Sequence, residues 1–178
     1  GSALSMPGMM DTILNLGLNS ATLPGLIKNT GNERFAYDAY RRFIQLFGKV
    51  ALGVADEKFD KPFDAIKKRA GAKQDLDLGA DDLREASELF LEVVQQETGH
   101  PFPEDVFQQL EIAIKAVFNS WSGKRAIDYR REFNITPDMA NGTAVNVQTM
   151  VFGNMGDDSA TGVGFTRNPA TGENAMFG

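Results

Sequence analysis

The sequence predicts an α+β fold, with a small helical bundle followed by an incomplete antiparallel β-hairpin or sheet segment. Residues 31–136 repeat their apolar side chains at helical spacing, whereas residues 137–178 alternate and are rich in turn signals. Methionine follows the same division, because all seven methionines lie outside residues 11–138. We therefore expect a helical segment inserted between two ends, residues 1–30 and 137–178, which belong together. Residues 1–30 are expected to form a loop and a short strand or connection.

The composition narrows the class of protein. The chain has 178 residues, 42% of them hydrophobic, which fits one globular domain or two small ones. A net charge of −6 argues against a nucleic-acid surface but leaves a nucleotide site possible. The absence of cysteine excludes disulfides, cysteine zinc sites and thiol nucleophiles, and it fits a reducing cytoplasm. No run of apolar residues approaches the length of a membrane span, so we expect no membrane partner.

The first residues do not look like a natural start. Gly1 and Ser2 are typical of the remnant of a cleaved tag, and there is no initiator methionine or signal peptide. We expect the chain to be a piece of a longer protein.

The first predicted helix starts near Arg34. Asn32 is suited to cap its first turn, and Gly53 to end it. Its apolar residues at helical spacing are Phe35, Ala39, Phe43, Ile44, Phe47 and Val50. A short basic helix is expected over residues 62–70, with Pro62 in its first turn.

Three further helices are predicted. Residues 79–99 carry acids in the first turn and Gly99 after the last, with an apolar face of Leu83, Leu89, Phe90, Val93 and Val94. Residues 102–121 have Pro103 early and an expected apolar face of Val106, Leu110, Ile114, Val117 and Phe118. Ser122 is suited to cap a final helix that carries Ile127, Tyr129 and Phe133. Short connections between four or five helices indicate a bundle.

The β prediction depends on the segment after Pro137. In "ANGTAVNVQTMVF", an Asn-Gly turn signal precedes an alternation that places Val145, Val147, Thr149 and Val151 on one face. The glycine-rich loop "GNMGDDSATG", the short strand "VGFT" and the turn "RNPATGE" follow. This pattern predicts a hairpin-like unit with a ten-residue connection, longer than a minimal hairpin turn.

The glycine-rich loop has two interpretations. Its small residues let the backbone approach a phosphate, and Ser159 and Thr161 add hydroxyl donors. However, it lacks the Walker sequence, and Asp157 and Asp158 repel phosphate unless a cation intervenes. A flexible hairpin loop with no ligand is the alternative.

Other candidate residues also leave alternatives open. Gln148, on the same strand face as Asn146, could hydrogen-bond a nucleotide or belong to a half-exposed strand face. His100 has no local catalytic partner and is interpreted as a loop residue. Pro7 and Gly8 suit the central pair of a type II turn.

Two residue clusters have similar alternatives. The methionines beside Pro7 could pack on a flat ring or fill a core. A cluster of acids could hold a metal but better fits the positive end of a helix. These acids are Asp75, Asp77, Asp81 and Asp82.

Three long blocks resemble a known family. "SMPGMMDTILNLGLN", "NERFAYDAYRRFIQLFG" and "AVNVQTMVFGNMGDDSATGVGFTRNPATGE" are similar to the nucleotide-binding part of the pyruvate, phosphate dikinase family, and "SW" followed by "RAIDYRR" matches between them. The resemblance covers essentially the whole chain in the family's order. It implies an ATP-grasp-like fold that binds ATP with Mg²⁺. The full-length enzyme would be a cytoplasmic homodimeric phosphotransferase that interconverts ATP, phosphate and pyruvate with AMP, pyrophosphate and phosphoenolpyruvate.

The resemblance also implies site residues. Gly8, Met10, Thr12 and Ile13 would face the nucleotide from one loop, and Gln148 would line the nucleotide cleft from a strand. Thr161 and Gly162 would belong to the glycine-rich loop over the ATP phosphates, so residues 137–178 would be a β-segment with a phosphate loop. No residue is assigned to catalysis or to a metal.

The chain departs from the family pattern in what it lacks. The family's ATP-site lysine and arginine, its later acids, its phosphohistidine motif and its TIM barrel are not present, and His100 does not match the motif. We therefore expect the chain alone to be inactive and to hold no cofactor tightly, with the remaining domains as its partners. The alternative is that the bundle is a non-catalytic docking or oligomer-contact module of the same enzyme.

Overall fold

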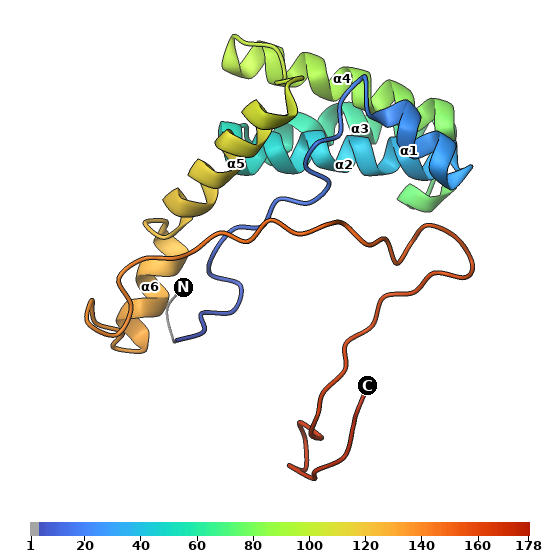
Figure 1. Cartoon of the computed structure of the whole chain (residues 1–178). Coiled ribbons are helices and arrows are strands. Elements are labelled where there is room, and N and C mark those ends of the chain that lie inside the picture. Colours follow the sequence, from blue (N-terminus) through green and yellow to red (C-terminus); the bar gives the residue numbers. More distant parts are fainter. Residues whose placement is uncertain (1–3) are drawn as a thin grey trace. The chain divides into compact units, whose positions relative to one another are not determined.

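The computed structural model describes residues 4–178, so Gly1 and Ser2 lie outside the described part of the chain. The chain forms two compact units, which divide between Gln148 and Thr149. We describe each unit by itself. The first contains all the helices of the described residues, drawn in Figure 1.

The helices follow from local signals. They are α1 (Leu23–Thr30), α2 (Glu33–Leu52), α3 (Asp56–Ala70), the 3₁₀ helix η1 (Asp75–Asp77), α4 (Ala80–Thr98), α5 (Val106–Ser120) and α6 (Lys124–Glu132). The predicted caps of α2 are confirmed: the Asn32 side chain accepts a hydrogen bond from Phe35 N–H at 2.9 Å, and Gly53 ends the helix with φ 75°. The predicted end of α4 at Gly99 is also confirmed. Within residues 4–178, no helix combines the length and apolar character needed to cross a membrane.

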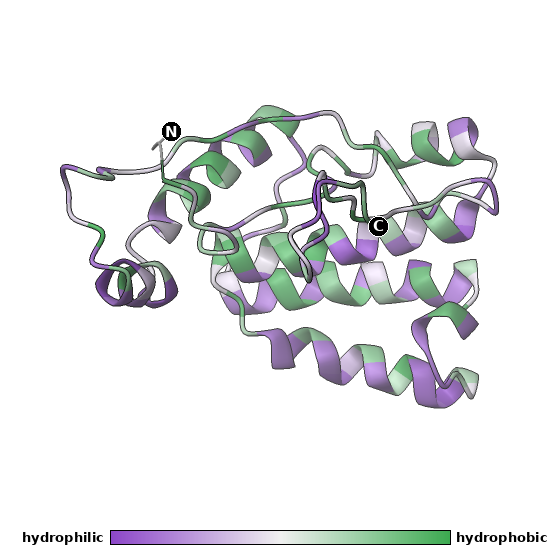
Figure 2. Cartoon of the chain, turned by 90° about the horizontal axis from the view of Figure 1, so that it is seen from below, coloured by the Kyte–Doolittle hydropathy of each residue, from purple (hydrophilic) through white to green (hydrophobic). Residues whose placement is uncertain are grey.

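Helix α2 is the centre of the first unit, because it contacts α1, α3, α4 and α5. Its buried side supplies Phe43 and Phe47, and these pack edge to face with Phe102 at centroid distances of 5.3–5.5 Å. Such aromatic pairs contribute about 0.5–1.5 kcal/mol each beyond their burial. Figure 2 shows apolar and polar residues on different faces of the helices, as a bundle core requires.

A buried ion pair also lies on α2. Arg41 is 3% exposed, and its guanidinium donates to Asp38 at 2.7 Å and lies 4.3 Å from the centroid of the Phe63 ring. Asp75 of η1 approaches the same guanidinium at 3.5 Å. The pair therefore joins α2 to α3 and η1 inside the bundle, and the sequence pattern gave no sign of it.

Three helix predictions need correction. Helix α3 begins at Asp56, so Pro62 lies inside the helix and not in its first turn. Gly123, not Ser122, is the N-cap of α6, and no side chain caps that end. Helix α1 lies within residues 1–30, where the sequence predicted no helix. Two acids in the first turn of α3 favour the earlier start, because they suit the positive end of a helix.

The buried face of α5 also differs from the prediction. Its buried residues are Gln109, Ala113 and Ala116, whereas Phe118, expected on the apolar face, is 49% exposed. Small residues permit a close approach of α5 to α2, which large side chains on that face would prevent. The apolar pattern was correct in its period but wrong in its phase.

The predicted β-segment is wrong. Within residues 4–178 the structure has no β-strand, and the only β-pairing is an isolated antiparallel bridge between Phe165 and Phe177. The alternating residues are extended without a ladder, and Val147 and Val151 are 66% and 89% exposed. A β-strand needs a neighbouring strand to pair with its backbone N–H and C=O groups. An alternating side-chain pattern does not provide that neighbour. The fold of the described residues is therefore helical, not α+β.

Candidate functional site

The first candidate loop begins with a tight turn. Met9 N–H donates to Met6 O at 3.1 Å across Pro7 and Gly8, and Gly8 has φ 71°. A positive φ at the third residue is what a type II turn requires, so the predicted turn is confirmed. The turn directs the chain from Met9 onward towards α5 and α6.

Asp11 fixes this loop to two helices. Its backbone N–H donates to Ser120 Oγ at the end of α5, at 3.1 Å, and its carboxylate accepts from Arg125 Nη2 of α6, at 2.7 Å. Arg125 also donates to Met9 O at 3.3 Å. In Figure 1 the blue N-terminal segment accordingly runs past α6 and α5 before it enters α1.

The four loop residues implied by the resemblance differ in exposure. Gly8 and Thr12 are exposed, whereas Met10 and Ile13 are half-buried. Met10 Sδ lies 3.8 Å from Ser120 Oγ, and Ile13 packs against the buried core. The loop therefore turns two of these residues towards solvent and uses the other two as anchors.

Beyond the loop, the chain is held by a buried glutamine. Gln109 is fully buried; its Oε1 accepts from Gly17 N–H at 2.9 Å, and its Nε2 donates to Leu18 O and Pro103 O at 3.1 and 2.8 Å. All the hydrogen-bonding capacity of the amide nitrogen is used, so one side chain joins the N-terminal segment, α5 and the loop before α5.

Glu104, in the loop before α5, also holds the N-terminal segment. Its backbone oxygen accepts from Asn19 Nδ2 at 2.7 Å, and its carboxylate accepts from Ser20 N–H and Oγ. Burial, and secondly the nearby Glu104 charge, raises the pKa of Tyr40 to about 12, so the phenol stays neutral. Asp11 and residues 17–20 are thus tied to α5 or to the loop before it, whereas Asn15 Nδ2 donates to Ala39 O of α2.

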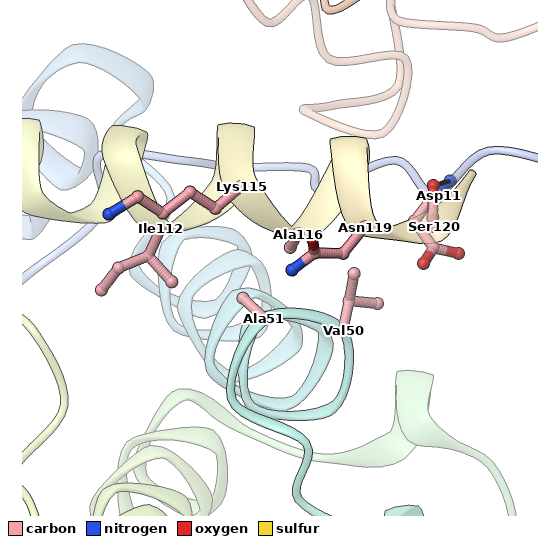
Figure 3. Close-up of a pocket in the computed structure, with 8 residues that line it drawn as sticks. All are labelled: Asp11, Val50, Ala51, Ile112, Lys115, Ala116, Asn119 and Ser120. Atoms are coloured by element: carbon pink, nitrogen blue, oxygen red, sulfur yellow. Dashed lines mark hydrogen bonds between the residues drawn. The ribbon is translucent and has the colours of Figure 1, made fainter. Parts of the chain in front are cut away.

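A pocket of about 380 Å³ lies beside Asp11, between α2 and α5 (Figure 3). Val50, Ala51, Ile112 and Ala116 give it an apolar floor, and Asp11, Lys115, Asn119 and Ser120 are its polar residues. It includes none of the residues that the resemblance implies for the nucleotide. The charges of Asp11 and Lys115 are already paired, with Arg125 and Glu111 respectively.

Gln148 belongs to a different segment of the first unit. It lies in the extended run after Gly142, is the last residue of the first unit and is exposed. Gly8, Met10, Thr12 and Ile13 thus share one loop. Gln148 belongs to the same unit but to a separate segment of it.

The second unit contains Thr161 and Gly162, both exposed. The glycine-rich loop is closed at its base: a Cβ atom on Gly153 would lie 1.8 Å from Thr161 Oγ1 and 2.7 Å from Ala160 O. Only glycine permits this approach. Ser159 N–H donates to Gly156 O at 3.0 Å and makes a turn within the loop.

The remaining candidates have structural roles. His100 is exposed in the link after α4, where its backbone N–H donates to Thr98 Oγ1. Asp77 accepts from the backbone N–H groups of Gln74 and Lys73, which lowers its pKa below the ordinary value, and Asp82 accepts from Gly79 N–H.

These acids do not form a metal site. Within residues 4–178, no three histidine or acidic side chains gather where they could hold a metal ion. The hydrogen bonds that Asp77 and Asp82 accept from backbone N–H groups agree with the interpretation of these acids as helix-entry residues.

Sequence reasoning missed the residues that hold the loop. Arg125, Ser120 and Gln109 contact segments about 90 to 115 residues away in the chain. Only the polar Gln109 within an apolar helical pattern was a usable signal, because a buried amide requires partners.

Comparison with known proteins gives a consistent result. Residues 2–178 match the family described as "Pyruvate phosphate dikinase, AMP/ATP-binding domain". The whole chain is 61% identical to a pyruvate, phosphate dikinase of Entamoeba histolytica and covers 20% of it. It is 57% identical, over 99% of its length, to that of Giardia intestinalis, again covering 20%. It is 53% identical to the chloroplastic pyruvate, phosphate dikinase 1 of Arabidopsis thaliana, covering 18% of that protein. The chain spans about a fifth of the length of these relatives.

Proposed function

The chain belongs to the pyruvate phosphate dikinase AMP/ATP-binding domain family, and we propose that it supplies part of the ATP cleft of a larger phosphotransferase. That enzyme would interconvert ATP, phosphate and pyruvate with AMP, pyrophosphate and phosphoenolpyruvate, through a phosphohistidine carried by another domain. The proposal is supported by the family description and by relatives that are more than half identical over the whole chain.

The observation that carries the proposal is the anchored loop. A tight Pro7-Gly8 turn leaves Gly8 and Thr12 exposed while Asp11 is held by Ser120 and Arg125. Such a loop presents a fixed surface to a ligand without ordering cost at the moment of binding. We assign the nucleotide-facing role to Gly8 and Thr12 through their exposed atoms, and to Met10 and Ile13 through the part of their half-buried side chains that stays accessible.

We assign two further parts of the cleft to other segments. Gln148 would hydrogen-bond the nucleotide, and Thr161 and Gly162 would lie over the phosphates. In this division residues 1–30 supply the nucleotide-facing loop and connection, residues 31–136 the helical subdomain and residues 137–178 the phosphate segment. The closed base at Gly153 supports a defined phosphate loop rather than a slack one.

We propose that the chain alone is inactive. Residues 149–178 carry one cation, Arg167, and three acids, and Arg167 donates to Gly172 O. A triphosphate needs cations and Mg²⁺ to neutralise its charge during transfer. These groups would come from the rest of the ATP-binding domain, which flanks this segment in the family, and the whole enzyme would be a cytoplasmic homodimer. The Arabidopsis relative is described as chloroplastic, so fractionation of the source cells would test the location.

A second candidate is a non-catalytic docking or oligomer-contact module. It is favoured by the outer side of α5, where Phe107 is 76% and Phe118 49% exposed. Sedimentation over a range of protein concentrations tests it. A rise in mass with concentration that Phe107→Ser abolishes would support the module, and a constant monomer mass would contradict it.

Thermal unfolding with Mg–ATP tests the nucleotide proposal. We would measure this chain and the same chain extended to the complete ATP-binding domain. A ligand at 100 times its Kd stabilises the folded state by about 2.7 kcal/mol, so the complete domain should melt clearly higher. We expect a smaller shift for this chain alone. No shift in the complete domain would overturn the nucleotide assignment.

A further inference from the structure

Arg125 is the only side chain of α6 that hydrogen-bonds the candidate nucleotide loop in the described part of the chain. Its guanidinium donates both to the Asp11 carboxylate at 2.7 Å and to Met9 O at 3.3 Å. It therefore holds two points of the loop, on either side of Met10. Both hydrogen bonds come from Nη2, whose two N–H groups have fixed directions in the guanidinium plane.

We propose that Arg125 is a positioning residue for nucleotide binding, which it controls through Asp11 and Met9 without touching the nucleotide. The inference rests on the proposed function, because it assumes that the loop from Gly8 to Ile13 faces ATP. Few hydrogen bonds form within the loop itself. Among residues 6–13, the one described bond between two backbone groups runs from Met9 N–H to Met6 O. The order of the loop therefore depends on contacts with α5 and α6.

The Arg125–Asp11 ion pair is partly exposed, so its effect on the position of the loop can be measured separately from its effect on global stability. The Arg125 side chain is 57% exposed and that of Asp11 33%. Exposed ion pairs contribute little to global stability. Removing Arg125 should therefore leave the melting temperature of the bundle nearly unchanged but loosen the loop. A residue with a merely structural role would lower the melting temperature instead.

The test compares two neighbours on α6. Arg125→Gln removes the loop contacts, whereas Lys124→Gln removes the adjacent cation, whose ion pair with Asp128 stays within α6. In the 178-residue chain, amide hydrogen exchange of residues 9–13 should become severalfold faster in R125Q and stay unchanged in K124Q. In the complete ATP-binding domain, R125Q should weaken Mg–ATP binding about fivefold or more.

Arg125→Lys gives a second, milder variant. The lysine side chain is one bond shorter than that of arginine and ends before the Nη2 position. Its ammonium can pair with Asp11 but does not also reach Met9 O, so the affinity of R125K should fall between those of wild type and R125Q. Intermediate affinity with an unchanged melting temperature supports positioning.

Two results would overturn the inference in distinguishable ways. If the wild-type domain binds Mg–ATP and R125Q matches K124Q in both exchange and affinity, Arg125 has no positioning role, while the proposed function stands. If the wild-type domain does not bind Mg–ATP, the proposed function fails and the inference fails with it.

Discussion

Gln109 and Gly17 are hydrogen-bonded at 2.9 Å although 92 residues separate them in the chain. Because Gln109 is fully buried and also donates to Leu18 O and Pro103 O, its loss would leave one N–H and two carbonyl groups without their partner. We expect Gln109→Ala to lower the free energy of unfolding by about 2–4 kcal/mol, measured by urea denaturation. Gln108→Ala, at the exposed neighbouring position, should cost less than about 0.5 kcal/mol. Equal effects of the two variants would contradict the role of Gln109.

A second prediction concerns the contact of α2 with α3 at Gly48. A Cβ atom there would lie 2.7 Å from Cζ of Phe59, a fully buried residue, and 3.5 Å from Cγ2 of Val94. Overpacking of this kind costs about 1–3 kcal/mol, which exceeds the gain of about 1 kcal/mol in helix propensity. We therefore expect Gly48→Ala to lower the urea midpoint.

The matched control for Gly48 is Gly25 in α1. It is exposed, and a Cβ atom there meets nothing within 4 Å. Gly25→Ala should raise stability by up to about 1 kcal/mol. If Gly48→Ala stabilises the chain as much as Gly25→Ala does, the close approach of α2 and α3 is not a constraint.

A third prediction concerns the closed base of the glycine-rich loop. Gly153→Ala would force the backbone away from Ala160 and Thr161, so the loop should open. Limited proteolysis should then cut residues 153–161 several times faster than in wild type, an order-of-magnitude expectation for a freed loop. Gly164→Ala, where a Cβ atom meets nothing within 4 Å, should leave the cleavage rate unchanged. An unchanged rate in Gly153→Ala would show that the loop is not closed at that point.

A fourth prediction concerns acid pH. The backbone N–H groups of Gln74 and Lys73 hold the pKa of Asp77 below its ordinary value, so the charged carboxylate favours the folded state. This contribution is complete above the unfolded pKa of about 3.9 and is lost as the pH falls through the lower folded pKa. Asp77→Asn should therefore be less stable than wild type at neutral pH, and the difference should shrink below about pH 4.

The acid measurement is thermal unfolding at a series of pH values. Asp81→Asn removes an exposed acid of the first turn of α4 and serves as the control. If the difference in melting temperature between Asp77→Asn and wild type stays constant from pH 7 to pH 2, the ionisation of Asp77 does not contribute to stability.

Local chemistry made part of this fold predictable. Asn32, Gly53 and Gly99 mark helix ends through their own side-chain or backbone properties, so α2 and α4 could be placed closely. The Pro7-Gly8 turn was predictable for the same reason, because the geometry depends on two adjacent residues.

The errors came from features that depend on distant residues. The alternation around Val147 predicts an extended chain but cannot supply a neighbouring strand, and the described structure contains none for it. The buried face of α5 is set by the close approach of α2, so Ala113 and Ala116 are buried in preference to Phe118. Within the candidate site, the resemblance supplied Gly8 and Thr12, but the anchors Ser120 and Arg125 are recognisable only once the chain is folded.

The ion pair between Asp11 and Arg125 also determines when the N-terminal loop can reach its final structure during synthesis. The two residues are 114 positions apart, so a ribosome adding about 5–20 residues per second makes Asp11 roughly 6–23 seconds before Arg125. During that interval α1 to α4 can form and pack, since their contacts are available earlier in the chain. The contacts of the N-terminal loop with Ser120 and Arg125 cannot form until α5 and α6 have been made. Bundle assembly would therefore precede completion of the candidate ligand surface, and during that interval the loop would be accessible to proteases and chaperones.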